Sequence, residues 1–271
     1  MTHPPFRFGP ALLFCPADRP DRFEKAAERA DAVIVDLEDA VAEDAKHAAR
    51  LALVSSTLDP ERVIVRVNPA STPHFADDLA ALAATDYRTV MLAKCEGTAD
   101  LIELEEFEVL ALCETARGVL AAEEVAALPN VSGLMWGAED LVASLGGSSS
   151  RHADGRYRDV ATHARSQVLL AAGAHEIAAI DAVHLDIRDA GGLRAEAEDA
   201  AALGFVATAC IHPSQVPIVR DAYHPSAERL EWARAVLAEA ASRPGVFAFR
   251  GGMVDAPVLR QAEAIVRRAG G

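Results

Sequence analysis

The sequence predicts an α/β fold, a TIM or (β/α)8 barrel followed by a C-terminal helical extension or lid. Length is the first reason, because 271 residues accommodate one barrel of about 250 residues. Composition is the second, since 51% apolar and 25% charged residues are typical of a globular chain. Order is the third: eight short apolar runs are each followed by a longer segment with helical periodicity. An open doubly wound sheet is the alternative.

The predicted strands are short runs rich in apolar or β-branched residues. They span residues 11–15, 32–36, 63–67, 89–93, 109–113, 132–136, 178–183 and 206–211. The segments after them repeat apolar residues at helical spacing, as helices do that pack one face on a sheet. These predicted helices span residues 20–29, 44–55, 75–83, 98–106, 117–127, 159–172, 193–202 and 214–222.

We assign residues 1–223 to the barrel and residues 224–271 to a helical extension within the same domain unit. The extension holds a long amphipathic helix at 226–242 and a tail in which Arg250, Gly251 and Gly252 are expected to form a flexible hinge. A barrel does not need this tail, so a lid or a contact between subunits is expected. The polar loop that follows the sixth strand lies where barrels carry active-site loops.

Charge and hydropathy exclude several classes of partner. The chain has 26 basic and 41 acidic residues, a formal charge of −15, which argues against nucleic-acid and anionic-membrane surfaces. No apolar run reaches the roughly 18 residues of a membrane helix, and no stretch resembles a signal-peptide core, so a cytoplasmic protein is expected. The four cysteines show no Cys-x-x-Cys spacing and are expected to be buried thiols without zinc or disulfides.

In a barrel, the carboxyl ends of the strands share one rim, and here several predicted strands end in acidic residues. Asp36, Glu38 and Asp39 follow the second strand, Glu114 the fifth and Asp140 the sixth. Carboxylates crowded at one rim repel one another, and a hard divalent cation relieves that repulsion. We expect Glu114 and Asp140, on adjacent strands, to bind Mg²⁺ or Mn²⁺ directly. Glu38 and Asp39 are expected to hold metal-bound waters, and helix capping or an ordinary acidic loop is the alternative for the set.

Basic side chains are expected at the same rim of the barrel. Arg66 ends the third strand, where partial desolvation favours a carboxylate or an oxyanion as its partner. Neutralising Glu38 or Asp39 is its alternative role. Lys94 is a candidate Schiff-base lysine, with an ion pair to Glu96 or Glu114 as the alternative. His212 is a candidate base, although capping a helix would explain it equally well.

A candidate phosphate-binding face precedes the second strand. Arg19, Arg22 and Lys25 recur at three-residue spacing on one side of the first predicted helix. In a chain this acidic, such a basic face would attract phosphates, and a solvated helix surface is the alternative. Gly191 and Gly192, before a later helix, are a weaker phosphate signal.

Seven segments resemble the citrate lyase beta subunit family and its stand-alone relatives, within the HpcH/HpaI aldolase and malyl-CoA lyase superfamily. They are LFCPADRP (13–20), VDLEDAV (35–41), VRVN (65–68), ETARG (114–118), GAEDL (137–141), IHPSQ (211–215) and GMVDAP (252–257). These segments occur in order and span most of the chain.

The resemblance implies a homotrimer, or a hexamer, of TIM barrels that use Mg²⁺ on a CoA or carrier-protein thioester and a small keto acid. Glu114 and Asp140 match its metal ligands, and Arg66 its substrate-carboxylate arginine, with Glu38 and Asp39 further out.

In the same comparison, Gly137, Ala138 and Glu139 match the backbone beside the keto acid. Asp255 matches a catalytic acid that the tail delivers to a neighbouring subunit.

The reaction that the resemblance implies is aldol-type cleavage or condensation of a 3-hydroxyacyl-CoA, such as malyl-, citramalyl-, citryl- or hydroxymethylglutaryl-CoA. The products of cleavage are acetyl-CoA and a keto acid. Three alternatives stay open. They are a Schiff-base aldolase that uses Lys94, a malate-synthase-like condensing thioesterase, and a non-catalytic subunit that binds acyl-CoA.

Overall fold

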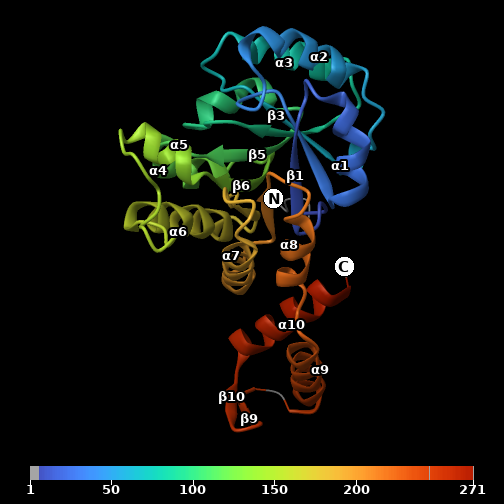
Figure 1. Cartoon of the computed structure of the whole chain (residues 1–271). Helices are drawn as coiled ribbons and strands as arrows, with labels where there is room; N and C mark the ends of the chain where they lie inside the picture. The colour runs from blue at the N-terminus through green and yellow to red at the C-terminus, as the bar shows by residue number, and fades with distance from the viewer. Residues whose placement is uncertain (1–5, 244, 271) are drawn as a thin grey trace. The chain divides into compact units, whose positions relative to one another are not determined.

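The computed structural model describes residues 6–243 and 245–270. The chain forms two compact units, Met1–Val219 and Arg220–Gly271. Within the described part of the first unit, eight parallel strands follow one another around a closed barrel, in which the last strand pairs with the first (Figure 1). The predicted barrel is therefore confirmed, and the open doubly wound sheet is excluded.

The strands lie where the apolar runs predict them. They are β1 (Ala11–Pro16), β2 (Ala32–Asp36), β3 (Val63–Val67), β4 (Thr89–Leu92), β5 (Glu108–Cys113), β6 (Val131–Trp136), β7 (Ala178–Asp181) and β8 (Ala207–Cys210). β2 and β3 have the predicted bounds, and the others differ by at most two residues at either end. This agreement follows from burial on both faces, which makes each strand a continuous apolar run.

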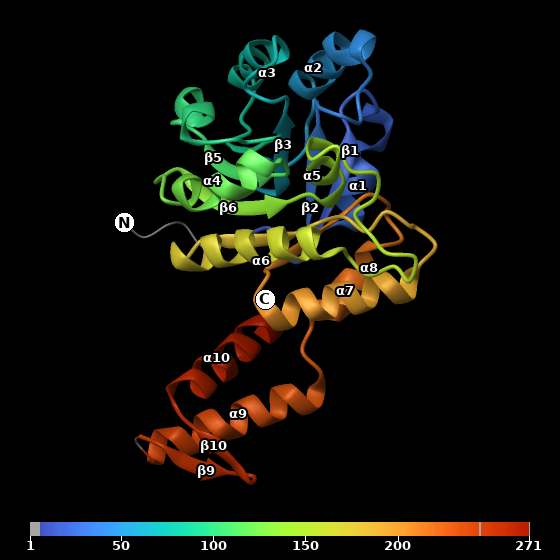
Figure 2. The same ribbon diagram turned by 90° about the vertical axis from the view of Figure 1, so that its left-hand side faces the viewer.

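Helices separate the strands and cover the barrel. They are α1 (Phe23–Arg29), α2 (Lys46–Val54), α3 (His74–Ala83), α4 (Ala116–Ala126), α5 (Ala138–Ser144), α6 (Asp159–Ala174), α7 (Ala190–Leu203) and α8 (Val216–Tyr223). Short 3₁₀ helices are η1 (Pro20–Arg22), η2 (Glu43–Ala45), η3 (Pro60–Arg62) and η4 (Thr98–Leu104). Figure 2 shows α4 and α6 running side by side next to β6.

One helix prediction was wrong, and one helix was not predicted. The segment 98–106 was expected as an ordinary helix, but it forms the 3₁₀ helix η4. Its buried residues, Leu101 and Leu104, are three apart, which matches the three residues per turn of a 3₁₀ helix. The sequence did not reveal α5, because its seven residues are too few to show a period.

Side chains fill the barrel interior. Inward-facing residues from successive strands form one buried cluster that includes Leu12, Ile34, Ile64, Met91 and Ile180. Because this packing closes the barrel axis, a ligand site has to lie at a rim. All four cysteines lie in the described part of the chain and are buried and free, as predicted. No helix of that part has the length and hydropathy that a membrane span requires.

The second unit has its own small core. Helices α9 (Ala227–Ser242) and α10 (Ala256–Gly270) pack together with a two-stranded antiparallel sheet, β9 (Phe247–Phe249) and β10 (Gly252–Val254). Arg250 and Gly251 join the two strands with φ angles of 48° and 83°. Two successive residues in the left-handed region are typical of a tight hairpin turn. The flexible hinge that was expected at this point is thus part of a hairpin.

Candidate active site

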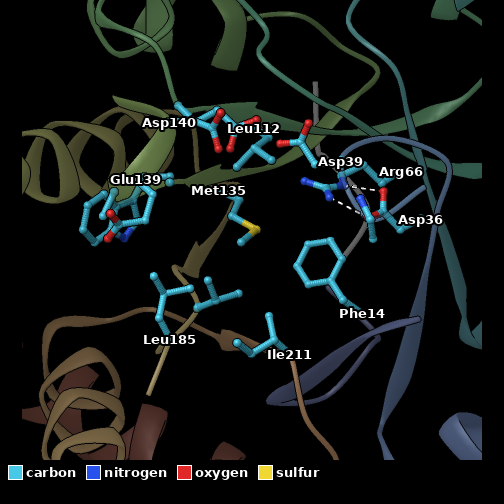
Figure 3. Close-up of a pocket in the computed structure, with 16 residues that line it drawn as sticks. Phe14, Asp36, Asp39, Arg66, Leu112, Met135, Glu139, Asp140, Leu185 and Ile211 are labelled. Atoms are coloured by element: carbon cyan, nitrogen blue, oxygen red, sulfur yellow. Dashed lines mark hydrogen bonds and ion pairs between the residues drawn. The ribbon is translucent and has the colours of Figure 1, made fainter. Parts of the chain in front are cut away.

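A cavity of about 240 Å³ lies where the strands of the barrel end (Figure 3). Its lining residues are Phe14, Asp36, Asp39, Ala40, Arg66, Leu112, Glu114, Met135, Trp136, Gly137, Ala138, Glu139, Asp140, Val183, Leu185 and Ile211. In Figure 3, Asp39 and Asp140 lie along one side, and Phe14, Leu185 and Ile211 along the opposite side. The cavity thus has a charged half and an apolar half.

Arg66 is held in place by acids from the neighbouring strand. Its Nε and Nη2 donate to the two carboxylate oxygens of Asp36 at 2.7 and 2.6 Å, and its Nη1 lies 3.1 Å from Glu38 Oε2. Burial opposes the charge of Arg66, but the Asp36 carboxylate outweighs burial and raises the pKa of the guanidinium. Arg66 therefore presents a fixed positive charge to the cavity.

Asp36 is a site residue to which the sequence analysis assigned no role of its own. It is fully buried, and its Cα pairs with that of Arg66 in the register between β2 and β3. This register brings the two side chains together, and the order of residues in the sequence does not reveal it. The available signal was an acid and an arginine that end consecutive apolar runs.

Lys94 contacts four carboxylates. Its Nζ donates to Glu38 and lies 3.1 Å from Asp39 Oδ2, 3.2 Å from Asp140 Oδ1 and 4.0 Å from Glu114 Oε1. Burial opposes the charged form, but the hydrogen bond to Glu38 and the nearby acids raise the pKa of Lys94. A Schiff base requires an unprotonated amine. These contacts therefore argue against the Schiff-base aldolase.

Glu114 and Asp140 approach the same ammonium group, as two ligands of one cation should. Glu114 is 4% exposed, and burial together with the charge of Asp140 raises its pKa to about 8. A Cβ atom on Gly137 would lie 2.7 Å from Glu114 Oε2, so the carboxylate occupies space that only glycine leaves open.

This donor set fits Mg²⁺. Among the described residues, no three His, Cys, Asp or Glu side chains are arranged to hold a metal ion. Mg²⁺ needs only one or two carboxylates, because it keeps several waters as ligands. Two crowded carboxylates at the mouth of a cavity meet that requirement, and a divalent cation would relieve the repulsion that raises the pKa of Glu114.

The acids after β2 differ in exposure. Glu38 is 3% exposed and joins the two cations, since one carboxylate oxygen meets Arg66 and the other meets Lys94. Burial raises the pKa of Glu38, although both cations oppose that shift. The Asp39 side chain is exposed, and its carboxylate contacts Lys94. Glu38 fixes the cations, and Asp39 faces the open cavity.

The polar loop after α5 reaches the cavity through Glu139, which accepts a hydrogen bond from Ser150. The next residue, Arg151, pairs with Glu196 on α7, and its guanidinium stacks 3.8 Å from the ring centroid of Tyr157. The loop is therefore anchored to both the cavity rim and the helix layer, as the position of an active-site loop predicts.

His184 makes the stability of the barrel depend on pH. Its Nδ1 lies 2.9 Å from Glu196, and its Nε2 lies 3.5 Å from Asp189. The hydrogen bond to Glu196 raises the pKa of His184 above 6.5, although burial opposes the shift. A raised folded-state pKa stabilises the fold below pH 6.5, and this contribution is lost as the pH rises through the folded pKa.

We therefore expect the melting temperature of the wild type to fall more steeply above pH 6.5 than that of His184→Gln. Calorimetry between pH 6 and 9 measures both slopes. His163→Gln, at an exposed histidine on α6, is the control and keeps the wild-type slope. Equal slopes for His184→Gln and the wild type would contradict the assignment.

Two groups of predicted residues do not line the cavity. Arg19 precedes η1, Arg22 ends η1 and Lys25 lies on α1, and all three are exposed. The Arg19 guanidinium donates two hydrogen bonds of 3.1 Å to Asp21. His212 also lies outside the lining and hydrogen-bonds with a neighbouring serine in its own loop.

Asp255 belongs to the second unit. One of its carboxylate oxygens accepts from Val258 N at 3.2 Å, which caps the start of α10. Asp255 therefore caps a helix of its own unit.

Comparison with known proteins identifies the family of this chain. The family model described as HpcH/HpaI aldolase/citrate lyase matches residues 10–213, which include all eight strands of the barrel. The chain belongs to this family. The resemblance read from the sequence motifs is therefore confirmed.

Three curated members of the HpcH/HpaI family are similar along most of their length. The citrate lyase subunit beta-like protein of Mycobacterium tuberculosis is 62% identical over 97% of this chain and 96% of its own. The (3S)-malyl-CoA thioesterase of Cereibacter sphaeroides is 37% identical, covering 89% and 86%. The human mitochondrial citramalyl-CoA lyase is 30% identical, covering 96% and 85%.

A solved structure of a family member shows the same fold. The protein CitE of Mycobacterium tuberculosis, in complex with magnesium, acetoacetate and coenzyme A, superposes with a TM-score of 0.93. It is 62% identical to this chain, and the match covers 97% of this chain and 98% of the other.

Proposed function

We propose that this protein is a Mg²⁺-dependent carbon–carbon lyase that cleaves or forms a 3-hydroxyacyl-CoA. Its products in cleavage are acetyl-CoA and a keto acid. The observation that carries the proposal is the convergence of Arg66, Glu114 and Asp140 on one cavity. The relatives support it, since one is named a citramalyl-CoA lyase and another is complexed with magnesium, acetoacetate and coenzyme A.

Glu114 and Asp140 would hold the metal. When bound, Mg²⁺ lowers the pKa of a substrate hydroxyl and polarises a carbonyl oxygen. Glu38 and Asp39 would hold waters around it. The backbone of Gly137, together with Ala138 and Glu139 at the start of α5, would lie beside the keto acid.

Arg66 would bind the carboxylate of the keto acid. Asp36 and Glu38 fix the orientation of its guanidinium, so little side-chain entropy is lost when the ligand binds. In cleavage, the substrate hydroxyl gives its proton to solvent water, the carbon that bears the hydroxyl becomes the carbonyl of the keto acid, and the carbon–carbon bond breaks. The electron pair of that bond moves into the thioester as an enolate. Asp255, from the tail of a neighbouring subunit, then protonates the enolate carbon.

The proposal also includes a site for the phosphates of CoA, an oligomeric state and a location in the cell. Arg19, Arg22 and Lys25 would bind the phosphates of CoA, because they form an exposed basic face in an acidic chain. A homotrimer or hexamer would let the tail after residue 223 act as a lid on the next barrel. We place the protein in the cytoplasm.

Incubation of the purified protein with MgCl₂ and malyl-, citramalyl-, citryl- and hydroxymethylglutaryl-CoA tests the activity. We expect acetyl-CoA and a keto acid from at least one of the four thioesters, detected by chromatography. If none is cleaved while acyl-CoA still binds, the protein is a non-catalytic subunit and the proposed lyase activity is wrong.

A malate-synthase-like condensing thioesterase is the second candidate, favoured by the similarity to a (3S)-malyl-CoA thioesterase. Such an enzyme releases free CoA thiol, whereas a lyase keeps the thioester bond. A thiol reagent added to acetyl-CoA and glyoxylate separates the two activities. Thiol release that depends on the keto acid would identify the thioesterase.

Arg66→Lys is expected to lower kcat/KM about a hundredfold. A lysine keeps the charge but cannot present two parallel N–H donors to Asp36 or to a substrate carboxylate. Losing one charge-assisted contact in the transition state corresponds to about 3 kcal/mol. Steady-state kinetics measure the loss, and Arg88→Lys, at a surface arginine, serves as the control. Wild-type kinetics for Arg66→Lys would remove the residue from the site.

A further inference from the structure

The Lys94 ammonium occupies the centre of the acids at the mouth of the cavity. It lies within 4.0 Å of Glu114 and Asp140, the two carboxylates proposed to bind the metal. It also contacts Glu38 and Asp39. A single monovalent cation therefore already contacts all four of these acids.

The charges around Lys94 are not balanced. Asp36 is matched by its two-pronged contact with Arg66, and Glu38 is shared between Arg66 and Lys94. Asp39, Glu114 and Asp140 also lie within 4.0 Å of the Lys94 ammonium, so more acids than cations meet in this cluster. The cluster therefore keeps a net negative charge, which attracts a second, more highly charged cation.

The backbone of Lys94 is held in an unusual conformation. Its φ angle is 49°, in the left-handed region that residues other than glycine rarely adopt. In this conformation its N–H donates to Glu114 Oε1 at 3.1 Å. Such strain persists only where the surrounding structure enforces it. Lys94 thus holds Glu114 with its main chain while its side chain contacts Asp140.

Position 94 holds a lysine, although most basic residues of this chain are arginines. Lysine occurs at only three positions, 25, 46 and 94, among 26 basic residues, so arginine is the usual cation of this chain. An ammonium is a compact charge whose three donors can meet carboxylates from several directions, whereas a guanidinium is a planar fork. The acids that contact Lys94 follow β2, follow β5 and lie on α5, a pattern that an ammonium satisfies.

We propose that Lys94 is a resident counter-cation that shares Glu114 and Asp140 with the divalent metal. Without metal, its ammonium holds the two carboxylates together and stabilises the acidic rim. When Mg²⁺ binds, the ammonium leaves Asp140 and stays with Glu38 and Asp39. Lys94 therefore stabilises the metal-free protein and lowers its affinity for Mg²⁺. The proposal rests on the magnesium site proposed above.

Calorimetric titration of MgCl₂ into the metal-free full chain tests this role without any substrate. We expect Lys94→Met to bind Mg²⁺ about tenfold more tightly than the wild type, because the positive charge that lies beside Glu114 and Asp140 and repels the ion is gone. Lys94→Arg keeps the charge and gives no gain. Arg29→Met, at an exposed arginine on α1, removes the same charge elsewhere and keeps the wild-type affinity.

Thermal unfolding supplies a second measurement. We expect metal-free Lys94→Met to melt several degrees below the wild type, and the difference to shrink in saturating MgCl₂, since a ligand stabilises most the protein that binds it best. A variant that folds only with MgCl₂ also supports the proposal. If Lys94→Met does not fold even then, Lys94→Gln takes its place under the same criteria.

Equal or weaker Mg²⁺ affinity in the variant, with a melting difference that MgCl₂ does not change, would overturn the counter-cation role alone. A wild type that binds no Mg²⁺ would overturn both this role and the proposed magnesium site. The two failures are therefore distinguishable.

Discussion

Glu114→Gln is expected to lower turnover about a thousandfold while the barrel stays folded. An amide has no charge to offer a divalent cation, so the variant loses the electrostatic stabilisation that the metal supplies in the transition state. Excess chelator should produce the same loss in the wild type. Initial rates at saturating thioester, with and without chelator, measure both effects.

The fold should tolerate this substitution for a physical reason. Burial and the charge of Asp140 raise the pKa of Glu114 to about 8, so the folded protein disfavours the ionised carboxylate. A neutral amide of the same shape avoids that penalty, and its oxygen can still accept the N–H of Lys94. We therefore expect the metal-free variant to melt no lower than the wild type at pH 8.

Glu96→Gln is the matched control. Glu96 follows β4 as Glu114 follows β5, but the Glu96 side chain is exposed and its carboxylate lies 3.7 Å from Arg117. We expect its kinetics to stay within about twofold of the wild type, as for surface changes away from a site. Full wild-type activity in excess chelator, or in Glu114→Gln, would contradict the metal site.

The strands and the rim acids were predictable because one physical constraint produces both. A strand that is buried on both faces must be apolar throughout, and the first polar residue after it must lie at the rim. Glu114 follows this rule directly after β5, Arg66 is the polar residue next to the end of β3, and both line the cavity. The position of each functional residue along its strand was therefore available from the sequence.

Contacts between strands were not available from the sequence. Asp36 holds Arg66 because β2 and β3 pair in a register that places the two residues side by side. Lys94 contacts acids that follow β2 and β5 and an acid on α5, because the barrel brings the ends of these strands to one rim. Each of these contacts depends on tertiary geometry, whereas a sequence pattern reports only local periodicity.

A turn in the tail was also not predictable from the sequence. Gly251 and Gly252 predicted a hinge, yet Arg250 and Gly251 form a tight hairpin turn between β9 and β10. The usual sequence signal for such a turn is Asn-Gly or Asp-Gly, and here an arginine occupies the first left-handed position. A three-residue strand on each side is too short to show alternation.

Asp255→Asn is expected to lower turnover about a thousandfold, the effect of removing a general acid or base. Asparagine can still accept the hydrogen bond from Val258 N that caps α10, so the second unit should keep its stability. Asp255→Ala removes both roles and is expected to lose about 1 kcal/mol of stability as well. Comparison of kcat and melting temperature in the two variants distinguishes the catalytic role of Asp255 from its helix-capping role. Wild-type turnover in Asp255→Asn would leave Asp255 with only its capping role.

Mixing the two inactive proteins shows where Asp255 acts. If the tail of one subunit covers the barrel of the next, a mixed assembly contains sites with an intact Glu114 and an intact Asp255 from different chains. Asp255→Asn and Glu114→Gln proteins, each inactive alone, should therefore regain part of the wild-type activity after subunit exchange. Exchange is checked with differently tagged chains. Proven exchange without recovered activity would mean that Asp255 serves the barrel of its own chain, and the shared site would be wrong.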